Sequence, residues 1–328
     1  MRPSERIPTV EDVRAAAALL RGHAIRTPLL EARLLSEELG CRLLVKAECL
    51  QRTGSFKFRG AFNAISRLPD AARRSGVVAF SSGNHAQGVA AAAQALGVKA
   101  TIVMPEDAPA MKIANTRAYG ARIVLYDRLN DDREAIAQAL ADEDGLAFVH
   151  PYDDPDVMAG QGTVGLELME QVAEMGVAVD AVLAPASGGG LVGGVALAVK
   201  AERSEAEVWT AEPEGYDDHA LSLAAGRRVA VRIGKPSLAD ALLAPQPGAI
   251  TSAVNQRLLA GSLVITDREA QQAMAAAFRH LKIVLEPGGA VALAAVLSGK
   301  LPVRGRTIAV VGSGGNVDAE VYRAALAV

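Results

Sequence analysis

Short apolar runs, separated by segments of helical composition, constrain the fold of this 328-residue chain most strongly. In runs such as 77–81 and 181–185, apolar residues occupy successive positions instead of every second one. Strands of this kind are buried on both faces, and a strand–helix–strand order favours right-handed βαβ units. Further strands of the same kind are expected at residues 43–48, 100–104, 122–126, 208–212 and 307–312. The pattern predicts an α/β protein with mostly parallel sheets.

The helical segments carry start and stop signals of their own. Thr9 can cap a helix that has Asp12 as its third residue, and Gly22 marks the end of that helix. Helices are also expected at residues 58–67 and 85–96. The length suggests about two domains, at about 150 residues each. The order of elements predicts a compact βαβαβα unit near residues 77–152, which we expect to be a smaller domain inserted into a larger one.

Composition and charge exclude several classes of protein. The 34 basic and 37 acidic residues give a net charge of −3, too close to neutral to attract nucleic acid or an anionic membrane. No apolar run is long enough to span a membrane, and the N-terminal segment lacks the apolar core of a signal peptide. Cys41 and Cys49 cannot build a disulfide framework and have no zinc-binding neighbours at usable spacing. We therefore expect a cytoplasmic protein with neither nucleic-acid nor membrane partners.

Three glycine-rich turns follow predicted strands, at residues 81–88, 186–194 and 311–318. A single turn of this kind serves strand–helix packing about as often as ligand binding. Three of them favour a ligand cleft, because ligands of open α/β sheets bind beyond the carboxyl ends of the strands. The turn 186–194 suits a single phosphate at a helix N-terminus. It has neither the Gly-Lys-Ser/Thr of a nucleotide loop nor a convincing dinucleotide fingerprint.

A lysine between two phenylalanines supplies a second chemical signal. Lys57 stands between Phe56 and Phe58 in a turn that opens a predicted helix. Most lysines lie on the surface, but the flanking aromatic residues favour partial burial, which disfavours the ammonium form and frees an amine that can attack a carbonyl. A phosphate site together with such an amine indicates a cofactor that is both a phosphate and an aldehyde, namely pyridoxal 5′-phosphate.

Four segments together resemble one family of enzymes. SFKFRGAFNA, SSGNHAQGVA, SGGGLVGG and GSGGNVD occur in this order along almost the whole chain. They resemble the fold-type II, tryptophan synthase β-like, pyridoxal-phosphate enzymes, in particular the serine/threonine dehydratase and serine racemase group. The resemblance implies a large domain from residues 1–76 and 153–328, a small domain from 77–152, and the cofactor in the cleft between these two open α/β domains. It also implies a homodimer.

The resemblance assigns roles to individual residues. Lys57 resembles the Schiff-base lysine, with Phe56 beside the cofactor. Asn84 resembles the residue that binds the 3-hydroxyl of the cofactor, Ser313 the one at its pyridine nitrogen, and Glu286 a glutamate of the cleft. The phosphate loop corresponds to Ser187, Gly188, Gly189, Gly190 and Leu191, where Ser187 replaces the usual first glycine. The substrate carboxylate is expected at Ser81, Ser82, Asn84 and His85.

Two further residues have two interpretations each. Ser82 lies where racemase-type members carry a second acid or base, whereas dehydratases can also carry a serine there that only supports the loop. Arg133 resembles an arginine on the substrate side of the racemase-like members. The alternative is an exposed arginine at a helix start, beside Asp131 and Asp132.

An acidic turn after the strand at 208–212 suggests a cation site. Glu212 and Asp218 are six residues apart, with the carbonyl of Tyr216 between them. Such oxygens suit Mg²⁺, Ca²⁺ or Mn²⁺, although most acidic runs are only solvated loops. The segment resembles the divalent-cation site of the family, which implies all three residues as ligands.

The function expected from these features is that of a pyridoxal-phosphate-dependent ammonia-lyase. Its substrate would be a small β-hydroxy amino acid, with L-threonine and L-serine as the first candidates. Serine racemase activity and a specialised dehydratase, for 3-hydroxyaspartate or in ectoine breakdown, are the alternatives. Ala241 stands where threonine dehydratases have a glycine, which favours a changed pocket. A catalytically silent cofactor-binding protein is the alternative from a different class, and the retention of Lys57 and Ser313 argues against it.

Overall fold

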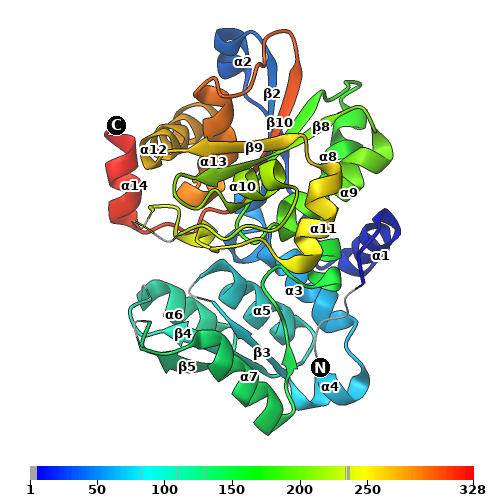
Figure 1. Cartoon of the computed structure of the whole chain (residues 1–328), viewed down its shortest axis with the longest axis vertical. Helices are drawn as coiled ribbons and strands as arrows, with labels where there is room; N and C mark the ends of the chain where they lie inside the picture. The colour runs from blue at the N-terminus through cyan, green and yellow to red at the C-terminus, as the bar shows by residue number, and fades with distance from the viewer. Residues whose placement is uncertain (1–5, 82, 109, 129, 233, 235–236) are drawn as a thin grey trace.

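Two separate β-sheets organise the chain, as Figure 1 shows for the computed structural model. The structure describes residues 6–81, 83–108, 110–128, 130–232, 234 and 237–328. The larger sheet lies in the upper half of Figure 1 and the smaller one in the lower half, with α3 (Lys57–Ser66) close to the level where the two halves meet.

The larger sheet has six strands in the order β1-β2-β10-β7-β8-β9. Only β1 is antiparallel to its neighbour, and Ile308 in the middle of the sheet is in register with both Leu43 and Ala181. The strands are β1 (Leu29–Glu31), β2 (Arg42–Ala47), β7 (Ala181–Pro185), β8 (Glu207–Pro213), β9 (Gly261–Ile265) and β10 (Thr307–Gly312).

Helices cover both faces of this sheet. One buried cluster joins the sheet to α12 (Asp267–Ala276) and α13 (Pro287–Leu297), and another joins it to α8 (Pro155–Glu174) and α9 (Gly190–Glu202). Two covered faces explain why the central strands are apolar at successive positions, as predicted.

The smaller sheet is wholly parallel and has the order β5-β4-β3-β6. Its strands are β3 (Val77–Phe80), β4 (Ala100–Pro105), β5 (Arg122–Tyr126) and β6 (Ala147–Phe148). It packs against α5 (Asn84–Ala95), α6 (Ala110–Ala118) and α7 (Arg133–Asp144). Phe58 and Phe62 of α3 belong to the same buried cluster as Val77 and Ile102, so residues before 77 also pack on this sheet. The domain limits at 77–152 stay a prediction.

The expected strands and helices are confirmed, with small shifts at their ends. The helix expected at 58–67 begins at Lys57, and the one expected at 85–96 begins at Asn84. Helix α1 (Val10–Leu20) has the capping box of Thr9 and Asp12. Strand β5 departs from the expected burial, because it lies at a sheet edge and is half-exposed. Three strands escaped prediction, namely β1, β6 and β9.

The remaining elements connect these layers. They are α2 (Arg33–Leu39), η1 (Glu48–Leu50), η2 (Arg52–Gly54), α4 (Asp70–Ser75), α10 (Asp218–Ala225), η3 (Asp240–Leu242), α11 (Ala249–Leu258), the π-helix η4 (Ala277–Leu281) and α14 (Ala319–Leu326). No helix in the described part of the chain has the length and apolar character that a membrane crossing requires.

Candidate active site

A cavity of about 180 Å³ lies between the two sheets, beyond the carboxyl ends of β3, β7 and β10. Its lining brings together almost all of the predicted cofactor and substrate residues. These are Phe56, Lys57, Ser81, Asn84, His85, Arg133, Ser187, Gly188, Gly189, Gly190, Leu191, Glu286 and Ser313. Ser82, the predicted second acid or base, lies outside the described residues.

Lys57 begins helix α3 at the base of this cavity. Its Nζ donates a hydrogen bond to the carbonyl of Pro151 at 2.7 Å and lies 5.3 Å from the ring centroid of Phe56. Burial lowers the pKa of Lys57 to about 8, because desolvation disfavours the ammonium form. Helix α5 can approach closely because residue 88 is glycine: a Cβ there would lie 2.9 Å from the carbonyl carbon of Lys57. The site therefore holds a lysine that carries a free amine at mildly alkaline pH.

The loop before α9 offers backbone N–H groups that have no partner. Within the described part of the chain, the N–H groups of Gly188, Gly189 and Gly190 donate to no acceptor. No side chain can replace these glycines without displacement, since a Cβ at Gly188 would lie 2.1 Å from the Tyr152 ring and one at Gly189 would lie 2.5 Å from His219. Gly189 also has φ of +93°, which L side chains rarely adopt. N–H groups without a described partner at the start of a 13-residue helix are suited to binding an anion.

Ser187 connects this loop to a neighbouring segment through a hydrogen bond. Its hydroxyl accepts a hydrogen bond from the N–H of Ala244 at 3.1 Å, and Ala244 also lines the cavity. The serine that replaces the usual glycine thus ties the phosphate loop to the segment around η3.

An asparagine and a glutamate meet on the opposite side of the cavity. Asn84 Nδ2 donates to Glu286 Oε1 at 2.5 Å, while Asn84 Oδ1 accepts from Asn316 Nδ2 at 2.7 Å. Glu286 is buried, and desolvation with help from Asp240 raises the pKa of its carboxyl to about 7. The second oxygen of Glu286 has no hydrogen-bond partner among the described residues.

Ser313 lies directly after β10 and lines the cavity. Its carbonyl accepts from the N–H of Phe56 at 3.1 Å, and an isolated bridge joins Ser55 to Gly314. These contacts place Ser313 beside the turn that carries Lys57. The hydroxyl can share a hydrogen bond with a ring nitrogen but cannot hold a proton there as a carboxylate would.

The predicted carboxylate-binding turn lies at the N-terminus of α5. His85 Nε2 lies 3.0 Å from the carbonyl of Val149, and its buried Nδ1 has no partner in the described structure. Desolvation, with the nearby charge of Lys57, lowers the pKa of His85 to about 3, so the ring is neutral. The Ser81 hydroxyl accepts from the N–H of Gly83 at 3.1 Å. Attraction for an anion therefore comes from the helix N-terminus and not from a histidine cation.

Cationic side chains line the small-sheet side of the cavity. Arg133 is exposed at the start of α7, with its guanidinium carbon 5.0 Å from the Phe80 ring centroid. It forms no ion pair with any described carboxylate, whereas Arg128 is paired with Asp107 at 3.0 Å. Arg133 is therefore an exposed helix-start residue that also lines the cavity, and its role on the substrate side stays a prediction.

An ion pair between a buried lysine and an exposed aspartate links the two halves of the molecule beside the cavity. Lys112 of α6 donates to Asp240 of η3 at 3.0 Å, and both residues line the cavity. Burial alone would lower the pKa of Lys112, but the charge and hydrogen bond of Asp240 raise it overall. Lys112, Asp240 and Tyr152 were not found from the sequence, because nothing local distinguishes them from surface residues.

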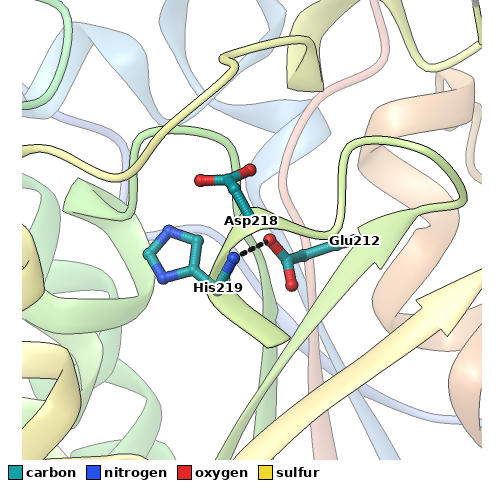
Figure 2. A group of neighbouring side chains, drawn as sticks. All are labelled: Glu212, Asp218 and His219. Atoms are coloured by element: carbon teal, nitrogen blue, oxygen red, sulfur yellow. Dashed lines mark hydrogen bonds between the residues drawn. The ribbon is translucent and has the colours of Figure 1, made fainter. Parts of the chain in front are cut away.

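Two of the three predicted cation ligands, Glu212 and Asp218, form a separate buried cluster with His219, shown in Figure 2. Glu212, Asp218 and His219 each place one ligand atom within 4.8 Å of the others. Both oxygens of Asp218 are buried without a hydrogen-bond partner in the described structure. Desolvation raises the pKa of Glu212 to about 7 and that of Asp218 to about 9. Tyr216 is buried in the same turn, where its N–H donates to the carbonyl of Pro213.

His219 links this cluster to the phosphate loop. Its backbone N–H donates to Glu212 at 2.8 Å, as Figure 2 shows, and its Nε2 lies 2.9 Å from the carbonyl of Ser187. The sequence did not single out His219 as part of the acidic turn.

Known proteins resemble this chain over nearly its whole length. The family model described as "Pyridoxal-phosphate dependent enzyme" matches residues 20–314. An L-threo-3-hydroxyaspartate ammonia-lyase of Pseudomonas sp is 44% identical over 96% of this chain and 97% of that protein. An L-threo-3-hydroxyaspartate ammonia-lyase of Saccharomyces cerevisiae is 42% identical over 96% of this chain and 95% of that protein. The solved structure of a threonine deaminase from T.th. is 47% identical, covers 95% of this chain and 99% of that one, and has a TM-score of 0.89.

Proposed function

Because the chain belongs to the family of pyridoxal-phosphate dependent enzymes, with a fold of type II, we propose that it is an ammonia-lyase for a β-hydroxy amino acid with a second carboxylate. The substrate of first choice is 3-hydroxyaspartate, which would give oxaloacetate and ammonia. L-Threonine is the second candidate, since a threonine deaminase is among the similar solved structures.

Arg133 is the observation that carries the choice of substrate. It faces the cavity and is not neutralised by any described carboxylate. A guanidinium group binds a carboxylate through paired, charge-assisted hydrogen bonds. A methyl group, as in threonine, would leave this cation without a carboxylate partner. Two similar proteins are L-threo-3-hydroxyaspartate ammonia-lyases, which supports the same choice.

The residues present fit the cofactor. The N–H groups of the loop at Gly188–Gly190 have no partner in the described structure, and they suit the phosphate. Asn84 Nδ2 suits the 3-hydroxyl of the ring, and the Ser313 hydroxyl suits its nitrogen. When bound, pyridoxal phosphate supplies an aldehyde that joins covalently to amines and a ring that withdraws electrons from them.

The chain supplies the proton transfers and the orientation. Lys57 would hold the cofactor, and its amine would be the base placed to take the proton from the substrate Cα. The N-terminus of α5, with Ser81, binds the α-carboxylate. Ser313 would share a hydrogen bond with the ring nitrogen without protonating it, which would make the bound ring a weaker electron sink and favour prompt loss of the substrate β-hydroxyl.

We propose further that Glu212, Asp218 and the carbonyl of Tyr216 bind a divalent cation, with Mg²⁺ as first choice. Two buried carboxylates, one of them without any described partner, are costly unless a cation neutralises them. The contact from His219 to Ser187 would then stiffen the phosphate loop. The homodimer and the cytoplasmic location stay predictions.

The test compares 2-oxo acid release from L-threo-3-hydroxyaspartate, L-threonine and L-serine by purified protein with pyridoxal phosphate and Mg²⁺. Arg133→Met should lower kcat/KM for 3-hydroxyaspartate by about 10- to 150-fold, the loss expected for a hydrogen bond to a charged group. The rate with L-threonine should change little, and Arg117→Met on α6 is the matched exposed control. Equal losses on both substrates would contradict the assignment of Arg133, and absence of any 2-oxo acid would contradict the lyase.

A further inference from the structure

Three polar side chains from distant segments form a series of hydrogen bonds that ends at the cavity wall. Asn316, in the loop after β10, donates through Nδ2 to the carbonyl of Thr53 at 2.7 Å and to Asn84 Oδ1 at 2.7 Å. Asn84 in turn donates through Nδ2 to Glu286 Oε1 at 2.5 Å. Asn84 and Glu286 line the cavity, whereas Asn316 does not. The sequence motif GSGGNVD contains Asn316, but its expected function uses only Ser313.

The direction of these hydrogen bonds follows from the backbone carbonyl at one end. The two ends of a side-chain amide are told apart only by their partners. The carbonyl of Thr53 can only accept, so the Asn316 atom that faces it is the NH₂ group. The second proton of that NH₂ group points to Asn84, which must therefore present its oxygen. The NH₂ group of Asn84 then faces Glu286 and the cavity.

We propose that Asn316 is a positioning residue, which fixes the side-chain amide of Asn84 with its NH₂ group toward the 3-hydroxyl of bound pyridoxal phosphate. The inference rests on the proposed cofactor site. Without Asn316, the amide of Asn84 could turn and present an acceptor to the cofactor oxygen. In that orientation the oxygen of the Asn84 amide would face the cofactor oxygen, and the hydrogen bond between the Asn84 NH₂ group and that oxygen would be lost.

The backbone conformation around Thr53 holds in place the carbonyl that accepts a hydrogen bond from Asn316. Thr53 has φ of +62°, in the left-handed region that residues other than glycine seldom adopt. A Cβ at the next residue, Gly54, would lie 2.7 Å from Asn316 Oδ1. The carbonyl that sets the orientation is thus held in a tight turn, packed against the side chain that it orients.

The experiment replaces the donor by an acceptor and measures cofactor binding. Asn316→Asp removes the NH₂ group and should turn the Asn84 amide, which then donates to the new carboxylate. The dissociation constant of pyridoxal phosphate should rise at least about tenfold, as for a lost hydrogen bond to a charged group. The absorbance spectrum of the lysine-bound cofactor should change as well. Asn115→Asp, on the exposed face of α6, is the matched control for the added charge.

A double-variant cycle tests whether the effect passes through Asn84. In an Asn84→Ala background, Asn316→Asp should change the dissociation constant by less than about twofold. An equal loss in both backgrounds, or wild-type affinity and spectrum in Asn316→Asp, would overturn the proposal. Asn316→Ala serves as a second variant, with a smaller expected loss. If neither variant folds without cofactor, Asn316 is a requirement of the fold, and the positioning role is contradicted. Cofactor binding is measured without substrate, so a wrong substrate assignment cannot imitate either outcome.

Discussion

The two walls of the cavity are built from different parts of the polypeptide. On the large-sheet side the loop at Ser187–Leu191 offers backbone N–H groups, and neighbouring atoms leave no space for side chains at its three glycines. On the small-sheet side the lining includes Arg133, Arg128 and the buried Lys112. Backbone N–H groups suit the cofactor phosphate, which is the same whichever substrate is used. Side chains that line the cavity can be replaced, and such replacements can change the substrate preference. The comparison predicts that cofactor affinity and substrate choice can be changed separately.

Lys57 lies between the walls, and its loss has the largest expected effect. Lys57→Ala should abolish turnover, by about 10⁴-fold or more, because it removes both the covalent attachment and the base. Borohydride should no longer trap cofactor on the protein, as measured by mass spectrometry. Lys99→Ala, on an exposed position, is the control. Wild-type turnover by the Lys57 variant would show that the site is wrongly assigned.

A side chain added to the phosphate loop should weaken cofactor binding and leave the residues on the small-sheet side of the cavity unchanged. In Gly188→Ala the added Cβ would lie 2.1 Å from a carbon of the Tyr152 ring. Overpacking of this kind should weaken cofactor binding by about 10- to 100-fold, as measured by equilibrium dialysis. Gly234→Ala provides the control, since nothing lies within 4 Å of its added Cβ. Unchanged cofactor affinity in Gly188→Ala would contradict the role of the loop.

The lowered pKa of Lys57 predicts how cofactor binding depends on pH. Burial lowers this pKa to about 8, so the reactive amine is a minor species at neutral pH and the main species at higher pH. The rate of covalent attachment to the cofactor-free protein should rise about tenfold from about pH 7 to about pH 9. Stopped-flow absorbance measures it. A rise of about 100-fold, as for a lysine with the ordinary pKa of about 10.4, would contradict a desolvated lysine.

Changes in the cation cluster should have the smallest effect of the four. The cluster reaches the phosphate loop only through the contact of His219 with the carbonyl of Ser187. Asp218→Asn replaces a buried carboxylate that has no described partner by a neutral amide. The variant should melt about 2–4 °C above the wild type in EDTA, since the uncompensated acid is gone. In Mg²⁺ it should melt below the wild type, because the ligand is lost. The same order of melting temperatures in both buffers would speak against a cation site.

The sequence predicted the parts of the site that depend on local chain geometry. Glycine turns after strands and the Phe-Lys-Phe segment are visible locally, and Glu212 and Asp218 share one short turn. Lys112, Asp240 and Tyr152 escaped prediction, because their proximity depends on how the two sheets pack. Asn316 stood in a recognised motif, yet its partners Thr53 and Asn84 are distant in sequence. The edge strand β9 was missed because it is only half-buried, so its apolar pattern is weak.

The most direct test of the two-wall account is substrate preference in two variants measured side by side. The ratio of kcat/KM for L-threo-3-hydroxyaspartate to that for L-threonine is determined with saturating cofactor for the wild type, Arg133→Met and Gly188→Ala. The account predicts that Arg133→Met lowers the ratio by at least about tenfold and that Gly188→Ala leaves it unchanged. A ratio that falls equally in both variants, or in neither, would contradict the separation of cofactor affinity from substrate choice.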